Sequence, residues 1–404
     1  MTRPLRVLIT NHMLAGRSGT EMYVHDLAKE LLARGHAPVV YSPKLGPLAQ
    51  ELTQATVTVV DDLSQVAMPP DIIHGHHTLE SAIALLHFPR APAIYVCHDW
   101  SWENDIPPRM DRIRRYVAVD HTVRDRLILL EGIPEAAVSV VNNGVDLKKF
   151  RPRGELPRAP RRAIVFSNYV TREQFAVIQA GCARHAIEVD GVGANIGFVS
   201  SKPENLIGQY DLVFAKGRCA WESLACGVAV IVCDTWGIGP LVTTQNLEFA
   251  RQRNFGRRLL QTELNEEAIR VRLEQYDAAD AKQVSRQIRE SCGLDKMVDR
   301  LIEVYEQAIA AHQAAAQQPA DEELRLLARL LQSWSRCKQP PQIEATDLRS
   351  IVHEELQLQQ LPILQKLDAL TTRRRGLRKF LHSVKKRLPG WMSGRSEPTI
   401  RKAA

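Results

Sequence analysis

The 404-residue sequence is poor in aromatic side chains, at 6%, and its seven cysteines form no CxxC pair. No stretch approaches the roughly 18 consecutive apolar residues that a transmembrane helix needs. Residues 1–10 also lack the apolar segment of a secretory signal peptide. An odd, scattered set of cysteines in a long chain does not indicate a disulfide framework. We therefore expect a cytoplasmic protein without structural zinc.

The chain has little net charge outside its carboxyl-terminal tail. Its formal charge is +7, but from Ala369 onward eleven basic residues accompany a single acid, Glu397, so the tail carries +10 and the remainder −3. This distribution excludes a strongly basic nucleic-acid-binding body, and we expect no nucleic-acid partner. With 45% hydrophobic residues, the length is sufficient for two domains and an appendage.

Short β-rich runs alternate with helical patterns over the first 150 residues. The run at 5–10 precedes a glycine-bearing loop, and the apolar positions within 24–32 then share one helical face that Gly35 ends. Further β-rich runs follow at 38–41, 71–74, 93–98, 116–119 and 138–141. This alternation predicts a doubly wound parallel sheet.

A second alternating series begins after a break. Residues 151–162 hold three prolines that interrupt any regular element, so we interpret them as a linker. Strand-like runs at 163–166, 211–214 and 228–232 follow. We therefore expect an α/β fold with two Rossmann-like doubly wound parallel-sheet domains, 1–150 and 163–315, whose interdomain cleft is the default ligand site.

Residues 316–404 are expected to form a helical extension with a basic tail. Within 373–391 an apolar stripe is interleaved with lysines and arginines. This pattern is typical of a helix that lies on an anionic membrane surface. The alternatives are a solvated tail, or a helix packed on its own protein or on another subunit.

The loop from Gly16 to Glu21 lies between the first predicted strand and the first predicted helix. Backbone N–H groups and the helix dipole at this place can hold an anion. The loop is neither a GxGxxG nor a Walker sequence. A simple tight turn with Thr20 as the N-cap explains it equally well.

The segment 216–231 is the most informative in the chain. A strand ends at Lys216, Gly217 and Arg218, a helix carrying Glu222 follows, and a glycine closes the helix before another strand. The cations and the helix N-terminus suit a diphosphate, and Glu222 could accept hydrogen bonds from ribose hydroxyls. The alternative is a plain βαβ turn in which the glutamate interacts with the helix dipole.

A second glycine loop at 234–240, with Gly237 and Gly239, follows the next predicted strand on the same edge. We expect it to lie beside the first one. Residues 254–258 hold cations near the end of the second sheet, and we interpret them as solvated surface.

These residues carry a resemblance to a known family. Residues 222–231 resemble the "E-A-M-A-C-G-x-P-V-I" segment of family 4 glycosyltransferases of GT-B fold. Residues 19–21 are similar to that family's "G-G-x-E" turn, residues 72–76 to its "D-I-I-H-x-H", and residues 143–152 to its "N-G-V-D-x-x-x-F-x-P". The four motifs occur in the family's order and cover roughly residues 5–315.

The resemblance implies a nucleotide-sugar donor in the carboxyl-terminal domain and an acceptor in the amino-terminal one. It implies transfer with retention and no obligatory metal or other cofactor. By this resemblance Glu222 contacts the ribose, His98 reaches the donor sugar, and Gly19 lies near the donor phosphates. Without the resemblance, His98 reads as a buried histidine at a strand end.

The sequence departs from the family pattern at the donor site. The family has another glutamate eight residues before Glu222, where this chain has Phe214. The family's arginine and lysine loop after the first strand of the second domain is replaced by 166–172, in which only Arg172 is charged. Lys216 and Arg218 could substitute for the family's arginine and lysine. A departing diphosphate requires a nearby cation, but that cation can come from either loop.

Other polar residues are weaker candidates. His74, His76 and His77 could suggest a metal cluster, but no acid accompanies them at a suitable spacing, so we expect no zinc. Asp99 and Asp120 could in principle do acid/base work.

We therefore expect a retaining glycosyltransferase of the hexosyltransferase type, peripheral at the inner face of the membrane and active on cell-envelope polysaccharide. Its acceptor is a hydroxyl of a glycan, lipid or polymer. The alternatives are a catalytically degenerate GT-B binding or scaffold protein, and a GT-B-like epimerase. The expected catalytic residues are His98, Lys216 and Arg218, and the expected donor-binding residues are Gly19, Glu21, Arg172, Gly217, Glu222, Gly237 and Gly239.

Overall fold

The structure is a computed structural model that describes residues 3–197, 200, 202–315, 325, 328, 329 and 332. The basic tail at 373–391, for which an interfacial helix is predicted, lies outside the described residues. In the part of the chain that the structure describes, no helix combines the length and apolar character needed to cross a bilayer.

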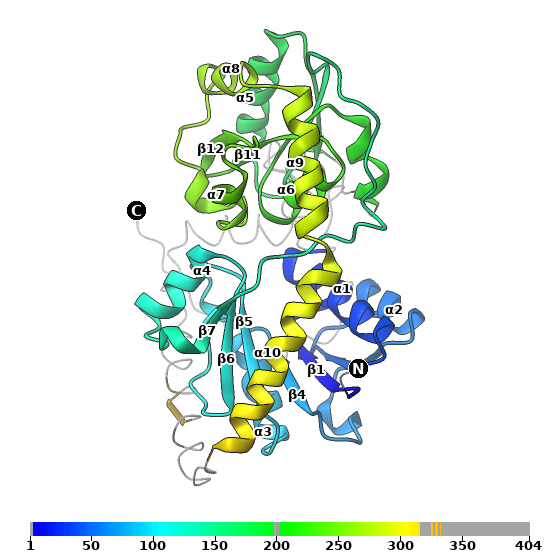
Figure 1. Cartoon of the computed structure of the whole chain (residues 1–404), viewed down its shortest axis with the longest axis vertical. Coiled ribbons are helices and arrows are strands. Elements are labelled where there is room, and N and C mark those ends of the chain that lie inside the picture. The colour runs from blue at the N-terminus through cyan, green and yellow to red at the C-terminus, as the bar shows by residue number, and fades with distance from the viewer. Residues whose placement is uncertain are drawn as a thin grey trace, which may run out of the picture. The chain divides into compact units, whose positions relative to one another are not determined.

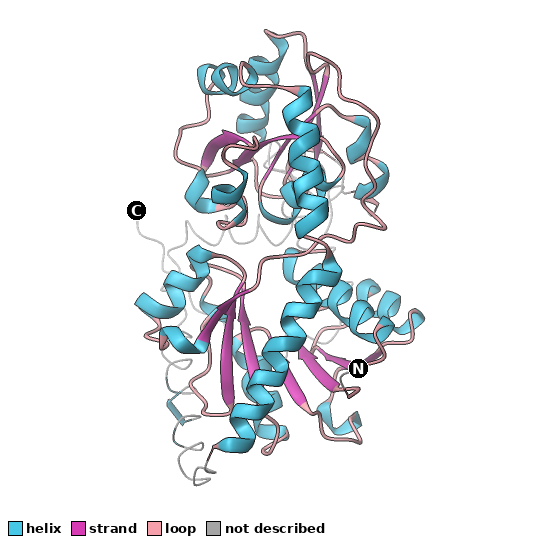
Figure 2. Ribbon diagram, viewed as in Figure 1, coloured by secondary structure: helices cyan, strands magenta, loops and turns pink. Residues whose placement is uncertain are grey.

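Among the described residues, the amino-terminal half forms a parallel sheet of seven strands in the order β3-β2-β1-β4-β5-β6-β7. Figure 2 shows its strands flanked by helices, as the α/β prediction requires. The strands are β1 Arg6–Thr10, β2 Ala37–Tyr41, β3 Thr58–Val60, β4 Ile72–Gly75, β5 Ala93–Cys97, β6 Ile113–Ala118 and β7 Val138–Val140. The connecting helices are α1 Gly19–Ala33, α2 Pro47–Gln54, α3 Thr78–His87 and α4 His121–Asp125.

The first helix shows how local sequence determines an element. In α1 the apolar side chains recur on one face, and Val24, Leu27 and Leu31 are fully buried. The N-cap is Ser18, so the expectation of Thr20 in that place was wrong. Gly35 follows the helix at φ +82°, a conformation that glycine adopts without steric cost, which confirms it as the stop signal.

The second sheet, again within the described residues, has five strands in the order β12-β11-β10-β8-β9. Four are parallel, and β12 runs antiparallel to β11 at the edge. The strands are β8 Arg162–Phe166, β9 Glu188–Val192, β10 Leu212–Ala215, β11 Ala229–Asp234 and β12 Gly237–Leu241. The helices are α5 Arg172–Ala183, α6 Gly217–Ala225, α7 Leu247–Arg251, α8 Glu266–Leu273 and α9 Ala278–Ser291.

The prediction of a glycine loop at 234–240 was wrong. The turn between β11 and β12 consists of Thr235 and Trp236, and both glycines belong to β12. A Cβ at Gly237 would lie 2.3 Å from the carbonyl oxygen of Thr262, and one at Gly239 would lie 2.8 Å from that of Leu259. These glycines therefore allow a neighbouring backbone to approach the edge strand closely.

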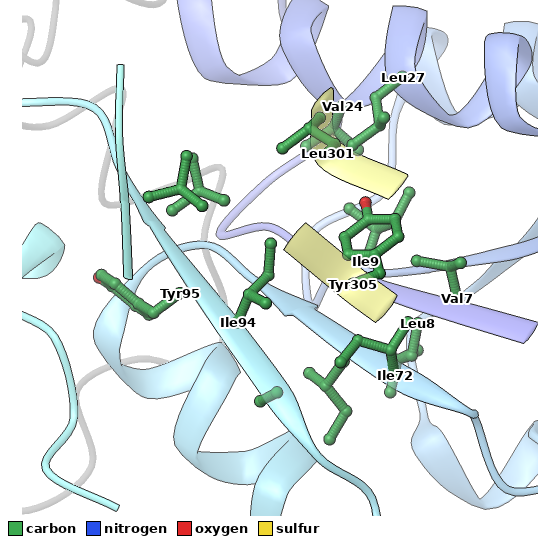
Figure 3. Close-up of a cluster of buried hydrophobic side chains, with 14 of the residues drawn as sticks. Val7, Leu8, Ile9, Val24, Leu27, Ile72, Ile94, Tyr95, Leu301 and Tyr305 are labelled. Atoms are coloured by element: carbon green, nitrogen blue, oxygen red, sulfur yellow. The ribbon is translucent and has the colours of Figure 1, made fainter. Parts of the chain in front are cut away.

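The last long helix, α10 Leu294–Ala314, packs against the amino-terminal half, although it follows the second sheet in sequence. Figure 1 shows it in yellow alongside the blue and cyan elements, and Figure 3 shows Leu301 and Tyr305 among Ile9, Val24 and Leu27. The expected domain 163–315 therefore loses its final segment. An apolar helical face predicts burial but does not specify which sheet buries it.

Candidate functional site

A cavity of about 950 Å³ opens where the carboxyl ends of several parallel strands meet. The loops after β1, β4, β5 and β6 line it from one half, and Tyr169, Arg218 and Asn254 line it from the other. The strand order reverses between β1 and β4, and open α/β sheets bind ligands at such reversals.

The loop between β1 and α1 is held in shape by one buried carboxylate. Glu21 is 2% exposed and accepts hydrogen bonds from the backbone N–H groups of Ala15, Gly16 and Ser18, at 3.0, 2.7 and 2.8 Å. The carboxylate thus orders the loop at the cavity wall. Among the predicted donor-binding residues, Glu21 is engaged by its own loop and positions the groups around it.

Gly19 begins α1 and lines the cavity. A Cβ placed on Gly19 would have no atom within 4 Å, so open space adjoins the helix N-terminus. The first N–H groups of a helix have no intrahelical partner, and the helix dipole favours negative charge there. This end of the cavity is therefore suited to an anion.

Arg218 brings a positive charge to the opposite side of the same cavity. Its guanidinium donates to Glu222 at 2.7 Å and to Asp26 of α1. Burial acts to lower the pKa of Arg218, but the two carboxylates outweigh it and raise that pKa. For Asp26, burial acts to raise the pKa, and Arg218 and His25 together lower it. The arginine therefore stays charged and links α6 to α1.

Glu222 lies behind Arg218 and does not line the cavity. Its side chain is 6% exposed, and burial raises its pKa while the Arg218 charge opposes that rise. In this arrangement the glutamate acts on the cavity through the arginine that it holds.

Lys216 and Gly217 also lie outside the cavity lining. The ammonium of Lys216 pairs with the buried Asp234 and lies 4.8 Å from the ring centroid of Tyr169. The N–H of Gly217 donates to the carbonyl of Phe255 at 3.2 Å. The predicted diphosphate loop is thus partly occupied by the protein's own groups.

Phe214 and Arg172, which stand at the two departures from the family pattern, both lie outside the cavity lining. Phe214 is fully buried within β10, and only Lys216 separates that strand from α6. Arg172 begins α5, is exposed and donates to the carbonyl of Asn195 at 3.3 Å. Like Gly237 and Gly239, it does not line the cavity.

His98 lies on the cavity within an array of histidines. Its Nε2 is 2.9 Å from Nδ1 of His76, and Tyr23 packs edge-on against it with ring centroids 4.7 Å apart. Burial, together with the charge of His77, lowers the pKa of His98 to about 3. Behind it, Nδ1 of His74 lies 2.6 Å from the hydroxyl of Tyr305 on α10, and burial lowers the pKa of His74 to about 3. These imidazoles are neutral at physiological pH.

The loop after β5 is fixed by acids that the sequence offered only as acid/base candidates. Asp99 accepts from the N–H groups of Ser101 and Trp102, at 2.7 and 2.8 Å. Asp105 is buried and accepts from the N–H groups of His98 and Asp99, at 2.6 and 2.7 Å. Burial raises the pKa of Asp105 to about 6. Asp120 instead caps α4 through the N–H of Val123.

Residues 254–258 are not simply the solvated surface that was expected. Phe255 is fully buried and Asn254 lines the cavity, both at positive φ, 47° and 54°. The Asn254 amide oxygen accepts from Trp221 at 2.6 Å and from Asn143 at 3.2 Å. No sequence pattern identified this residue, because its partners are 33 and 111 positions away.

Within the described residues, no group of three His, Cys, Asp or Glu side chains has the geometry to hold a metal ion. The histidines contact aromatic rings and one another instead. The ring centroids of Tyr23 and His76, for example, lie 5.3 Å apart.

Residues 17–149, which supply most of this cavity wall, match the family model for Glycosyltransferase Family 4. The amino-terminal domain is a family 4 glycosyltransferase domain. Its motif residues Gly19, Glu21 and His98 all line the cavity. The matched range ends before the linker.

Solved structures share the fold over both halves. A glycosyltransferase from Rickettsia africae has 15% identity and a TM-score of 0.57, covering 76% of this chain and 99% of its own. HepE from Anabaena, solved with UDP and glucose, has 16% identity and a TM-score of 0.54, covering 75% of this chain and 100% of its own. A candidate UDP-N-acetylglucosamine 2-epimerase from Listeria monocytogenes has 14% identity and a TM-score of 0.50, covering 79% of this chain and 99% of its own. The family 4 domain and the second sheet together therefore form the GT-B fold. No curated protein sequence matches the chain.

Proposed function

We propose that this protein is a retaining glycosyltransferase that moves a sugar from a UDP-sugar to a hydroxyl group of a glycan or lipid-linked acceptor. One observation carries the proposal. A single cavity presents the open N-terminus of α1 and the charged Arg218, and it lies at the carboxyl ends of both sheets. The family 4 match and the UDP and glucose bound by HepE support this choice of donor.

In the proposed complex the donor diphosphate lies between the α1 N-terminus and Arg218. Helix N–H groups and a guanidinium are both strong partners of phosphate oxygens. Both are fixed before the donor arrives, by Glu21 on one side and by Asp26 with Glu222 on the other. Preorganised charge of this kind stabilises a departing diphosphate without reorganisation during the reaction.

The chemistry breaks the bond between the anomeric carbon and the diphosphate oxygen, and a bond from the acceptor oxygen forms on the same face of the sugar. The acceptor proton passes to the departing diphosphate. This route needs no enzymic nucleophile. The acids at the cavity support this route, because Glu21, Asp99 and Asp105 already accept hydrogen bonds from backbone N–H groups. His98, neutral at the cavity wall, would contact a hydroxyl of the donor sugar.

A second candidate function is donor binding without transfer. Two observations favour it: Phe214 is buried where the family has a glutamate, and Lys216 is paired with Asp234 rather than facing the cavity. A third, epimerisation of the donor itself, has fold-level support from the Listeria structure.

The test is product analysis of purified protein with UDP-glucose, UDP-N-acetylglucosamine and UDP-galactose, each with and without oligosaccharide or polyprenyl-phosphate sugar acceptors. The proposal predicts UDP release and an extended acceptor whose new linkage keeps the anomeric configuration of the donor. Binding without UDP release would establish the second candidate. An isomerised nucleotide-sugar formed without acceptor would establish the epimerase.

We further propose that the enzyme acts at the inner membrane face on a cell-envelope polysaccharide, with the +10 tail as its contact to anionic lipid. Vesicles containing phosphatidylglycerol should retain the full chain and release a version truncated after Asp368. Equal retention of both would remove the tail from the proposal.

A further inference from the structure

The cavity lining also includes His77 and Trp102, which the proposed transfer mechanism does not use. The two rings meet edge-on, with centroids 5.0 Å apart and an interplanar angle of 79°. His77 comes from the end of β4, and Trp102 from the loop after β5. Each residue is held in an arrangement that costs free energy in the absence of a ligand.

The backbone of His77 is strained. This residue is the N-cap of α3 and has φ 60° and ψ 141°, a region that side chains other than glycine rarely adopt. Strained conformations persist only where the surroundings impose them, and they concentrate at ligand-binding sites. The ring of His77 is 2% exposed, so the strain places a polar ring in a buried position.

The hydrogen bonds of Asn11 define the tautomer of His77. The amide nitrogen of Asn11 donates to the carbonyl of Met13 at 2.6 Å, which leaves its Oδ1 facing Nε2 of His77 at 3.0 Å. Oδ1 can only accept, so Nε2 carries the proton. Burial lowers the pKa of His77 to about 4, and Nδ1 is therefore a bare acceptor at neutral pH.

This Nδ1 has no hydrogen-bond partner within the part of the chain that the structure describes. A buried acceptor without a partner is costly, and a ligand O–H that entered from the adjoining cavity would relieve that cost. Its neighbours, His12 and Trp102, offer it ring contacts at 6.1 and 5.0 Å between centroids.

Trp102 presents an apolar face to solvent on a rigid loop. The side chain is 42% exposed and lines the cavity. Its carbonyl accepts from Arg126 at 3.2 Å and its N–H donates to Asp99 at 2.8 Å. Thr78 further ties the loop down through the carbonyls of Asn104 and Ile106, at 2.9 and 2.6 Å. These hydrogen bonds fix the backbone around Trp102, and the fixed backbone keeps the indole exposed to solvent.

We propose that His77 and Trp102 form a pyranose subsite that holds the acceptor saccharide. A pyranose ring has one face of C–H groups, which packs on an aromatic ring, and hydroxyls at its rim, which donate to a bare nitrogen. Both residues come from the amino-terminal half, whereas Arg218 comes from the other half. The inference rests on the proposed function, because it names the acceptor of that same cavity.

The experiment measures binding of cellotriose, maltotriose and chitotriose to the full chain by isothermal titration calorimetry, in the absence of nucleotide. At least one trisaccharide should bind. Trp102→Ala should weaken that binding at least tenfold, and Phe249→Ala should change it less than twofold. Phe249 is a matched control, since it is an aromatic residue 56% exposed in the other half and outside the cavity lining.

His77→Gly separates the acceptor atom from folding. Glycine adopts the positive φ without steric cost, so the variant should melt no lower than the parent chain while its trisaccharide affinity falls about fivefold. His77→Asn returns an oxygen acceptor at the δ position, so it should recover most of the affinity.

Three results would overturn the inference: no trisaccharide binds, Trp102→Ala leaves binding unchanged, or Trp102→Ala releases the chain from phosphatidylglycerol vesicles instead. A parallel titration with UDP and UDP-glucose distinguishes the sources of the sugar. Weaker binding of UDP-glucose alone in Trp102→Ala would assign the ring to the donor and refute the acceptor subsite. If the parent chain binds a trisaccharide but neither nucleotide, the proposed function fails while the subsite stands.

Discussion

The two halves of the molecule contribute unequally to the cavity between them. The amino-terminal half lines it with loops from four neighbouring strands, and these loops are fixed by buried acids such as Glu21 and Asp105. The carboxyl-terminal half lines it with Tyr169, Arg218 and Asn254. The family match has the same asymmetry, because it covers residues 17–149 and not the second sheet.

The carboxyl-terminal half brings little positive charge to the cavity. In the second half, one residue connects β10 to α6, and Lys216 is paired with Asp234. Arg218 is the one arginine or lysine among the described residues that line the cavity. In the proposed complex the positive charge that faces the donor diphosphate therefore comes from a single residue, Arg218, which also contacts the amino-terminal half through Asp26.

The largest expected effect comes from acid, which should act on the amino-terminal half. Burial lowers the pKa values of His74 and His98 to about 3 and of His77 to about 4, below that of an unfolded histidine. Between pH 6.5 and these values the unfolded chain binds more protons, so stability falls as the pH falls. Asp105, with its pKa raised to about 6, opposes this, because its stabilising protonation increases toward lower pH.

The three histidines outweigh Asp105, and the net loss of unfolding free energy from these four groups between pH 7 and pH 4.5 should be on the order of 5 kcal/mol. Urea denaturation at the two pH values measures it. His74→Asn should show a smaller difference than the parent chain. Equal stability at both pH values would contradict the buried, neutral array.

Arg218→Met should have the next largest effect, because it leaves Asp26 and Glu222 buried without their cation. Removing one partner of a buried pair costs about 3–5 kcal/mol. Affinity for UDP-glucose should fall at least tenfold. The double variant Arg218→Met/Asp26→Asn should regain part of the stability and none of the affinity, whereas recovery of both would show that the arginine is only structural.

Glu21→Gln should have an intermediate effect confined to the family 4 half. The amide keeps one oxygen but brings an NH₂ group toward the N–H groups of Ala15, Gly16 and Ser18. Unsatisfied groups of this kind cost about 1–3 kcal/mol. Calorimetric titration should give weaker UDP-glucose binding, together with faster amide exchange in residues 15–18. Unchanged exchange would show that the carboxylate does not order the loop.

The smallest effect is expected for Arg172→Ala in the other half. This exposed arginine donates to a backbone carbonyl and does not line the cavity. The KM for the donor should stay within twofold of the parent value. A larger increase would mean that the carboxyl-terminal half supplies a second phosphate contact, which would reduce the asymmetry between the halves.

The sequence predicted most of the fold because each long buried strand is a β-branched run. The GT-B fold and the family 4 resemblance were confirmed. β9, with the sequence EVDGV, and β12, with GIGPL, were not recognised, because charged residues, glycine and proline obscure the strand pattern. The partner of α10 was not predictable either, since its periodicity identifies an apolar face and no neighbour.

The candidate site was predictable only where a residue belongs to a motif. Gly19, Glu21 and His98 were identified in this way, and Arg218 was identified as a substitute cation from the neighbouring glycine loop; the structure places all four at the cavity. Asp26 gave no signal, because its role depends on an arginine 192 positions away. The environment of His77 depends on Asn11 and Trp102, which are distant in sequence and close only in the fold.

The most direct test of the central claim is a thermal-shift titration with UDP-, GDP-, ADP- and dTDP-sugars on the parent chain and on Arg218→Met. A ligand at a hundred times its Kd should stabilise the folded chain by about 2.7 kcal/mol. We expect UDP-sugars to raise the Tm of the parent chain. Arg218→Met should abolish this rise, and Arg172→Ala should leave it unchanged. No rise with any nucleotide-sugar, or a rise that Arg218→Met retains in full, would contradict the central claim.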